Sequence, residues 1–261
     1  MNIDFHTHGR LSKKLSFDRE YTDALFQCAK KSGLDAVCLT EHFNTVEFTV
    51  IYDYMCQYYE QQGDTFLYQG LRIYPGMEID VLERGHTLFL GNYKEIVEFN
   101  QQLEPYKEKG KFLPLEQLLK MAQPYEFIKG IAHPYREGCR LTEGLDELLK
   151  QFDFIDLNGK DVAIYGDVMR TKVKQLANEL KLSVVGGSDT HQALQYGSLY
   201  TMMNEEISTI RKLKQEINAG NYKLYINPEI SYRVKAAGAL KRALKEIDAL
   251  NGDYIQFAMI H

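Results

Sequence analysis

Two histidines separated by a single residue, His6 and His8, follow a short apolar segment at the start of the chain. Side chains two residues apart on a β-strand point to the same side of it, so both imidazoles could reach one metal ion. A single pair of this kind also occurs on protein surfaces and in cores without any metal. Its interpretation therefore depends on whether ligand-type residues recur at equivalent places later in the chain.

Ligand-type residues do recur where later apolar segments end. The chain has seven histidines, and six of them occur at or beside such segment ends. With two carboxylates, the candidate metal ligands are His6, His8, His42, Glu78, His86, His133, Asp189 and His191. Imidazoles and carboxylates suit zinc, manganese or iron, and a carboxylate can bridge two ions. Each residue alone could equally have a structural role, such as a loop hydrogen bond or a helix N-cap, but their repetition predicts a metal centre.

The segments between these residues alternate between strand-like and helix-like patterns. Short apolar runs predict strands at 3–5, 36–39, 71–79, 87–91, 128–132, 154–157, 183–185 and 198–202. Helical spacing of apolar residues, or a helix-favouring composition, predicts helices at 18–32, 46–61, 95–103, 115–121, 142–152, 167–180, 205–219 and 234–250. Strands that alternate with helices indicate a largely parallel sheet covered by helices.

The candidate ligands lie at or just past the carboxyl ends of predicted strands, where α/β barrel enzymes build their sites. This convergence predicts an α/β fold with about seven strands closed into a TIM-like barrel, although periodicity alone also allows an open, doubly wound sheet. No GxGxxG motif follows the first strand, which weakens the dinucleotide-binding version of the open sheet. A chain of 261 residues suits a single barrel domain over 1–261, with a helical extension at about 232–251.

Composition and charge are those of a globular protein with a sizeable core: 44% of the residues are hydrophobic, 26% are charged and the formal net charge is −5. The negative charge disfavours a general nucleic-acid or membrane-surface binder, although a metal cluster could still attract a phosphorylated substrate. The four cysteines form no CxxC pair, which indicates reduced thiols and a cytoplasmic protein. Because the ligand-bearing strand starts at once and no apolar run reaches membrane-spanning length, we expect neither a signal peptide nor a membrane segment.

The order of the motifs resembles the PHP (polymerase and histidinol phosphatase) superfamily. The motifs that carry the resemblance run from residue 1 to about 200 and are His6-x-His8, Thr40-Glu41-His42, Gly76-x-Glu78, His86, His133-Pro134 and Gly187-Ser188-Asp189-x-His191. The resemblance implies a distorted seven-stranded α/β barrel with a site of two or three divalent metal ions that hydrolyses phosphoesters. By the same resemblance, the first ion would be held by His6, His8, Glu78 and Asp189. A second ion would be held by Glu78, His86 and His133, and a third by His42 and His191.

One position departs from the family pattern. Members with three metals often carry a further ligand after the His-x-His pair, whereas this chain has Lys13 there. An ammonium group has no lone pair with which to bind a cation. Either the third site is weak and completed by water, or Lys13 replaces the ion as a fixed charge that binds phosphate. The loop could also leave Lys13 in solvent.

Two bridged ions would generate a hydroxide near neutral pH and neutralise the phosphoryl oxygens, with Glu78 as the shared ligand. Arg136 and Arg10 are candidates to bind the remaining oxygens, because a guanidinium matches phosphate bidentately; both could equally be surface residues. His191 or His42 could serve as the general acid. Asn158 is interpreted as a turn residue. The predicted catalytic residues are Glu78, His191 and Arg136, and the predicted phosphate-binding residues are Lys13, Arg10 and Arg136.

These observations predict a metal-dependent phosphoesterase that acts on a small phosphorylated compound, with monoesters favoured over diesters. Histidinol-phosphate phosphatase is the named alternative, and a nucleotide or oligonucleotide phosphoesterase is another. The negative net charge argues against long nucleic acids. A different class is a non-catalytic module whose ligands hold a structural ion. The two classes differ in whether the ion keeps an open coordination position, and a cluster rich in histidine and carboxylate favours catalysis.

Overall fold

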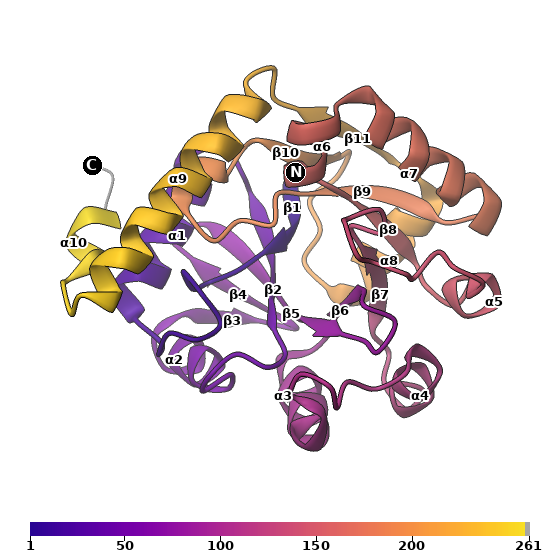
Figure 1. Ribbon diagram of the computed structural model, residues 1–261, viewed down its shortest axis with the longest axis horizontal. Coiled ribbons are helices and arrows are strands. Elements are labelled where there is room, and N and C mark those ends of the chain that lie inside the picture. The colour runs from indigo at the N-terminus through magenta and orange to yellow at the C-terminus, as the bar shows by residue number, and fades with distance from the viewer. Residues whose placement is uncertain (259–261) are drawn as a thin grey trace.

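The computed structural model describes residues 1–258 and has a mixed β-sheet at its centre with helices around its outside (Figure 1). Seven strands follow one another as hydrogen-bonded neighbours: β1 (Asn2–Thr7), β2 (Ala36–His42), β5 (Leu71–Asp80), β6 (His86–Leu90), β7 (Ile128–Ala132), β8 (Phe154–Asn158) and β9 (Ser183–Gly187). All seven begin and end within a few residues of the predicted strands.

Strand β6 is the exception to the predicted parallel arrangement. It is antiparallel to both β5 and β7, whereas β1, β2 and β5 are parallel to one another, as are β7, β8 and β9. Only residues 81–85 separate β5 from β6. A link of that length cannot contain the crossover that a parallel neighbour requires, so the chain turns back and pairs Asp80 with His86.

The two ends of this strand series meet beside β1. A parallel bridge joins Thr7 to Thr190, the backbone amide of Asp189 donates to the carbonyl of His6 at 2.7 Å, and that of His8 donates to the carbonyl of Thr190 at 2.9 Å. The sheet is thereby nearly closed. The predicted α/β class with a TIM-like barrel is confirmed.

Four further strands extend this framework. β10 (Leu199–Met203) is antiparallel to β1 and pairs with β11 (Tyr222–Ile226), while the hairpin of β3 (Glu60–Gln62) and β4 (Thr65–Tyr68) joins the edge of β5. The predicted helix at 46–61 is therefore wrong at both ends, because α2 covers only Val50–Tyr58. The backbone is already extended at Tyr59, and Gly63 has a positive φ of 58° in the tight turn of the hairpin.

The remaining helices are α1 (Arg19–Lys31), α3 (Tyr93–Gln102), α4 (Leu115–Met121), α5 (Asp146–Leu149), α6 (Gly159–Tyr165), α7 (Asp167–Leu180), α8 (Ile210–Ala219), α9 (Ile230–Ala249) and α10 (Tyr254–Ala258). The prediction for α7 is confirmed residue by residue. The predicted helix at 142–152 shrinks to one short turn after Gly144, which has a φ of 76°. Helix α6, which the sequence analysis missed, begins directly at the end of β8 and carries residues of the site.

Apolar side chains pack against both sides of the barrel strands. Fully buried residues such as Phe5, Tyr74 and Phe154 form one cluster with Leu213 of α8, and the Tyr74 hydroxyl donates to the carbonyl of Ile207 at 2.7 Å. A larger cluster fills the space between the strands and the outer helices. Within residues 1–258, every helix is too short or too polar to span a lipid bilayer.

Candidate metal centre

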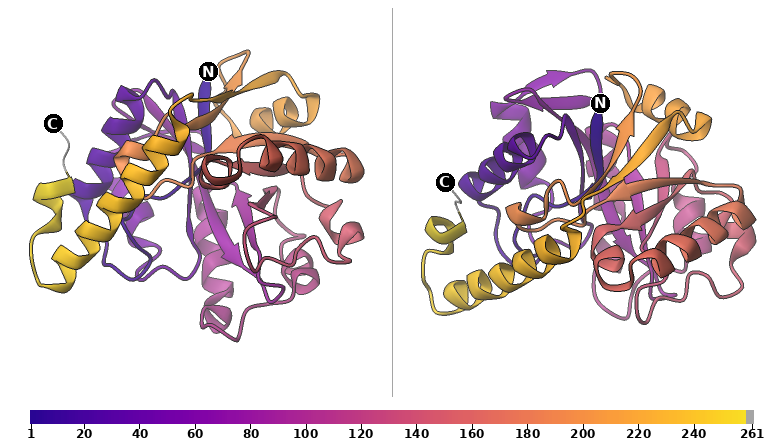
Figure 2. Two further views of the ribbon diagram at one scale, coloured as in Figure 1. Left: turned by 45° about the horizontal axis from the view of Figure 1, so that its top comes forward. Right: turned by 90° about the horizontal axis from the view of Figure 1, so that it is seen from above.

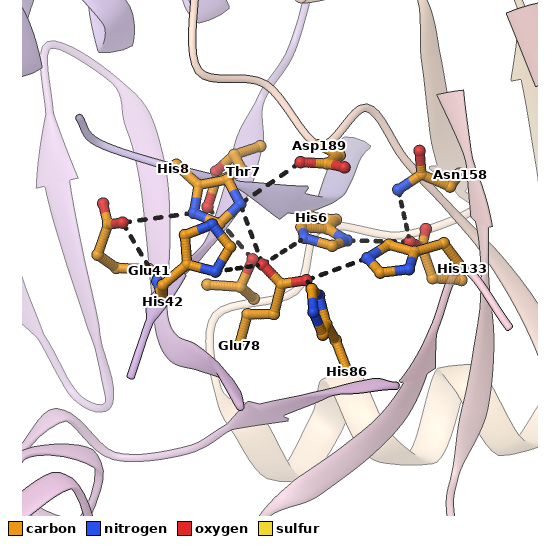
Figure 3. A network of polar contacts seen from close by, with 12 residues as sticks. His6, Thr7, His8, Glu41, His42, Glu78, His86, His133, Asn158 and Asp189 are labelled. Carbon is orange, nitrogen blue, oxygen red and sulfur yellow. Dashed lines mark hydrogen bonds and ion pairs between the residues drawn. The ribbon is translucent and has the colours of Figure 1, made fainter. Parts of the chain in front are cut away.

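The eight predicted ligands come together at one end of the barrel, and Figure 3 labels all of them except His191. They lie near the ends of β1, β2 and β5, on the first residue of β6, and in the segments that follow β1, β7 and β9: His6, His8, His42, Glu78, His86, His133, Asp189 and His191. His86 reaches this end from the start of its strand because β6 runs antiparallel to β5. The antiparallel direction of β6, which the prediction of a parallel sheet did not include, is therefore what brings His86 to the site.

One carboxylate oxygen of Glu78 faces three histidines. Its Oε2 atom lies 3.5 Å from His6 Nε2, 3.4 Å from His8 Nε2 and 3.0 Å from His42 Nδ1. Glu78 is buried, with 1% of its surface exposed. Three imidazole nitrogens from three different motifs thus lie close to one buried carboxylate oxygen.

The other oxygen of Glu78 faces a separate pair of histidines. Its Oε1 atom lies 2.6 Å from His86 Nδ1 and 3.1 Å from His133 Nε2. His86 is held on its far side by Asp80, whose Oδ1 atom lies 2.9 Å from His86 Nε2. The two oxygens of Glu78 therefore point to different histidine groups, as a carboxylate that bridges two ions must.

Asp189 is the second carboxylate among the candidate ligands. Its Oδ1 atom lies 3.6 Å from His8 Nε2 and 2.8 Å from Lys160 Nζ, and its Oδ2 atom lies 2.9 Å from Arg136 Nη1. The residue has a positive φ of 57°, a conformation that a non-glycine residue rarely adopts and that is often found at functional sites.

Three groups of ligand atoms within residues 1–258 are compact enough to hold an ion, each with its atoms within 4.8 Å of one another. The groups are His8, His42 and His191; His6, His8 and Asp189; and His6, Glu78 and His133. The three groups contain seven of the eight residues predicted as ligands, and their grouping differs from the one that the resemblance implies. His86 lies outside all three groups, since its two ring nitrogens face Asp80 and Glu78.

Unsatisfied buried atoms indicate that this donor set fits metal ions. His6 Nε2, His8 Nε2, His42 Nδ1 and Glu78 Oε2 are all buried and have no hydrogen-bond partner within the described part of the chain. A buried polar atom without a partner costs about 1–3 kcal/mol, and ions bound in the three groups would supply partners for all four residues. Imidazole and carboxylate donors suit zinc, manganese or iron.

Two buried carboxylates orient the first histidine pair from behind. Asp156 Oδ2 lies 2.9 Å from His6 Nδ1 and also accepts from Asn158 Nδ2 at 3.0 Å, while Glu41 Oε1 lies 3.4 Å from His8 Nδ1. A carboxylate behind a ring fixes its tautomer and leaves the opposite nitrogen free to ligate. The sequence analysis missed the role of Asp156, although a charged residue inside the apolar run of β8 was a signal.

His191 is oriented by a backbone carbonyl. Its Nδ1 atom lies 3.2 Å from the carbonyl oxygen of Arg10, and because a carbonyl only accepts, Nδ1 must carry the proton. The Nε2 atom is then unprotonated and faces the centre. This tautomer suits a metal ligand or a proton acceptor better than the predicted general acid.

Three of the histidines are kept in the neutral form that binds metals, whereas the pKa of His6 and that of His86 are raised by the nearby carboxylates. Burial lowers the pKa of His42, of His133 and of His191, which keeps these rings in the neutral form that binds metals. Burial acts in the same direction on His6, but Glu78 and then Asp189 raise its pKa well above the ordinary value. His6 therefore carries a proton that an arriving ion would displace.

The predicted phosphate-binding residues have different environments. The guanidinium of Arg10 donates to the carbonyls of Val46 at 2.6 Å and Glu47 at 2.7 Å and is almost fully buried, so it ties two loops together and does not face the centre. Lys13 is partly exposed, and its Nζ atom lies 3.5 Å from Asp80 Oδ2. Lys13 thus contacts the carboxylate that supports His86.

Arg136 lies at the centre but is fully engaged with acidic and amide oxygens. It donates to Asp189 at 2.9 Å, to Asn158 at 2.9 Å and to both oxygens of Asp161 at 3.3 Å. Asn158, interpreted from sequence as a plain turn residue, thereby links Arg136 to Asp156. The site residue Asp161 was not anticipated, because it lies on the unpredicted helix α6.

Comparisons with known proteins agree with this architecture. Residues 170–222 match the model of the PHP-associated family. PsfC from Pseudomonas syringae PB-5123 has the same fold with a TM-score of 0.75, is 20% identical, and is aligned over 93% of this chain and 98% of its own. A search of curated proteins finds no match to this chain.

Two further solved structures share the fold at lower similarity. PfuEndoQ, a lesion-specific endonuclease from Pyrococcus furiosus, has a TM-score of 0.63 at 16% identity, over 85% of this chain and 57% of its own. A protein from Bifidobacterium adolescentis ATCC 15703, named as a candidate metal-dependent phosphoesterase, has a TM-score of 0.52 at 14% identity, over 83% of this chain and 95% of its own. The family match over residues 170–222 agrees with the resemblance to the PHP superfamily, and the three structural likenesses confirm the barrel class of the fold.

Proposed function

We propose that this protein is a metal-dependent phosphoesterase that hydrolyses a small phosphorylated compound. The observation that carries the proposal is the position of Glu78, whose two carboxylate oxygens face different groups of histidines in a buried centre with unsatisfied ligand atoms. When bound there, two or three divalent ions would supply a hydroxide near neutral pH and neutralise phosphoryl oxygens.

The chain's own residues hold this centre in register. Glu78 keeps the two histidine groups at a fixed separation. Asp156 and Glu41 lie at the Nδ1 atoms of His6 and His8 and so direct the two Nε2 atoms into the centre. Arg136 and Lys160 neutralise Asp189 and fix its orientation, so we assign Arg136 a positioning role beside its predicted role in binding phosphate. In the tautomer that the Arg10 carbonyl requires, His191 presents a proton acceptor to the centre.

The size and charge of the surroundings favour a small substrate. A cavity of about 330 Å³ adjoins His42 and His191, and the chain's net charge of −5 disfavours binding of a long nucleic-acid backbone. The second candidate is hydrolysis of a nucleic-acid phosphodiester, because PfuEndoQ, which shares the fold, is a lesion-specific endonuclease. Histidinol phosphate is one monoester within the first candidate class.

The environment of the thiols supports a reducing compartment. All four cysteines, Cys28, Cys38, Cys56 and Cys139, are free, which is the usual state in cytoplasmic proteins. We therefore propose a cytoplasmic location.

The direct test is a panel of phosphomonoesters, a chromogenic phosphodiester and an oligonucleotide with an abasic site, each assayed with zinc, manganese or iron. We expect hydrolysis of monoesters that depends on added metal and that falls at least about 100-fold in Glu78→Gln, because removal of a bridging ligand disrupts both histidine groups. Glu116→Gln, an exposed substitution of the same type on α4, is the matched control. A folded, metal-loaded protein that hydrolyses no member of the panel would contradict the proposal.

A further inference from the structure

A cavity with an unusual charge lies beside the metal centre. Its volume is about 330 Å³, and its inner wall is formed by His42 and His191 of the candidate metal ligands. The rest of the lining comes from the loop after β1 and from helix α9, which lie far apart in the sequence: Ser12, Lys13, Lys14, Lys241 and Lys245. Four of the seven lining residues are therefore lysines, and none of the seven is acidic.

Most of this positive charge is uncompensated. Lys13 lies 3.5 Å from an oxygen of Asp80, whereas Lys14, Lys241 and Lys245 form no ion pair with any residue in 1–258. The chain as a whole is negative, with a net charge of −5. A cluster of cations in one cavity is thus a local feature and does not follow from the average composition.

The acidic ligands of the metal centre do not account for these lysines. Asp189, the ligand carboxylate on this side, is already contacted by Arg136 at 2.9 Å and by Lys160 at 2.8 Å. Divalent ions in the centre would add positive charge and make the cavity more electropositive still. The partner that would stabilise the lysines is therefore an anion that comes from outside the protein.

Helix α9 holds two of the lysines in fixed positions. It runs along the outside of the molecule past α6 towards α10, and passes beside the segment that follows β9 (Figures 1 and 2). Ala237 and Leu244 are 1% and 0% exposed and anchor it to the barrel. Lys241 and Lys245 are four residues apart and so share one face of the helix, about 6 Å apart along its axis.

The ammonium groups of Lys241 and Lys245 repel each other, and this repulsion favours binding of an anion between them. Like charges four residues apart on a helix destabilise it, and Lys241 is also partly buried, which lowers its pKa to about 7. An anion between these side chains would replace the repulsion with charge-assisted hydrogen bonds. The cavity is thus less favourable when empty than when an anion is bound.

We propose that Lys14, Lys241 and Lys245 form an anion subsite that binds a second anionic group of the substrate, next to the ester phosphate at the metal centre. The inference rests on the proposed function for the role of the centre itself. Lys14, Lys241 and Lys245 line the same cavity as His42 and His191, and Lys14 and Lys245 are exposed. The substrate class is accordingly a phosphoester that also carries a carboxylate or a second phosphate.

The test compares two phosphonates that cannot be hydrolysed and that differ in one charge. 3-Phosphonopropionate carries a carboxylate where propylphosphonate carries a methyl group. Binding of each to the metal-loaded protein is measured by isothermal titration calorimetry, so that the readout does not depend on turnover. We expect 3-phosphonopropionate to bind about tenfold or more tightly than propylphosphonate, as one or two charge-assisted contacts imply.

Variants of α9 assign that preference to the lysines. In Lys241→Met/Lys245→Met the preference should disappear while the affinity for propylphosphonate changes by less than about twofold. Lys235→Met, which removes an exposed lysine of the same helix outside the cavity, should keep the preference. Circular dichroism checks that each variant is folded.

The outcomes separate this inference from the proposed function. A wild-type protein without the preference, or a double variant that keeps it, overturns the anion subsite even if phosphoesters are hydrolysed. A preference that depends on the two lysines supports the subsite even if no phosphoester in the panel is hydrolysed, and in that case the proposed function alone fails.

Discussion

Replacement of Asp156 by asparagine should weaken metal binding without unfolding the protein. The Asp156 carboxylate lies 2.9 Å from His6 Nδ1, and the side chains of both residues are 0% exposed. It also accepts a hydrogen bond from Asn158 Nδ2 at 3.0 Å. An amide at this position keeps the shape of the side chain but loses the charge, and its single oxygen cannot serve both donors equally.

The size of the effect follows from the role of such carboxylates. Loss of the partner behind a ligating histidine typically weakens metal affinity by about 10–100-fold, which corresponds to about 1.4–2.8 kcal/mol. This range agrees with about 1.5–3 kcal/mol for a hydrogen bond to a charged group. We therefore expect Asp156→Asn to raise the dissociation constant for zinc or manganese about 10–100-fold.

Competition with a chromogenic chelator measures this constant directly. Asp167→Asn makes the same substitution at a carboxylate that is 87% exposed on α7 and should leave the affinity unchanged. If Asp156→Asn is folded and binds metal within about twofold of the wild type, the assignment of His6 as a ligand oriented by Asp156 is refuted.

Three further predictions concern stability and protonation. Gly187→Ala should lower the melting temperature and weaken metal binding, because a Cβ there would lie 2.4 Å from His6 Cβ and overpacking costs about 1–3 kcal/mol. Gly238→Ala on α9 is the control, since its Cβ would meet only Arg242 Nη1 at 3.8 Å. An unchanged melting temperature in Gly187→Ala would contradict the close approach to His6. Chelation should lower the melting temperature, and readdition of metal should release a proton from His6, seen as a binding enthalpy that varies with the ionisation enthalpy of the buffer. Burial lowers the pKa of Lys241 to about 7, so between pH 7 and the ordinary lysine pKa the unfolded chain binds more protons than the folded one, and stability rises with pH across that window. Lys241→Met should therefore stabilise the protein at pH 6, with a gain in melting temperature that shrinks towards pH 10. An equal gain at both pH values would argue against a buried ammonium.

Local patterns in the sequence predicted most of the secondary structure. Helix α7 follows from its apolar spacing, and short apolar runs identify β2, β7 and β8, because burial of one side of an element leaves a periodic trace in the sequence. The failures occur where such a trace is weak. The hairpin of β3 and β4 is stabilised by pairing with the edge of β5, and the short helix α6 depends on contacts with β8 and α9.

The type and order of the ligand residues can be read from the amino-acid sequence, since eight imidazole and carboxylate side chains follow or end its apolar segments. Their grouping depends on how the chain folds. The tertiary structure turned β6 antiparallel and so brought His86 to Glu78, and it set Asp156 behind His6 across 150 positions of the chain. It also placed Lys241 of α9 in one cavity with His42 and His191. These contacts join segments that are distant in sequence, and their geometry is fixed by packing of the closed sheet, which no local pattern records.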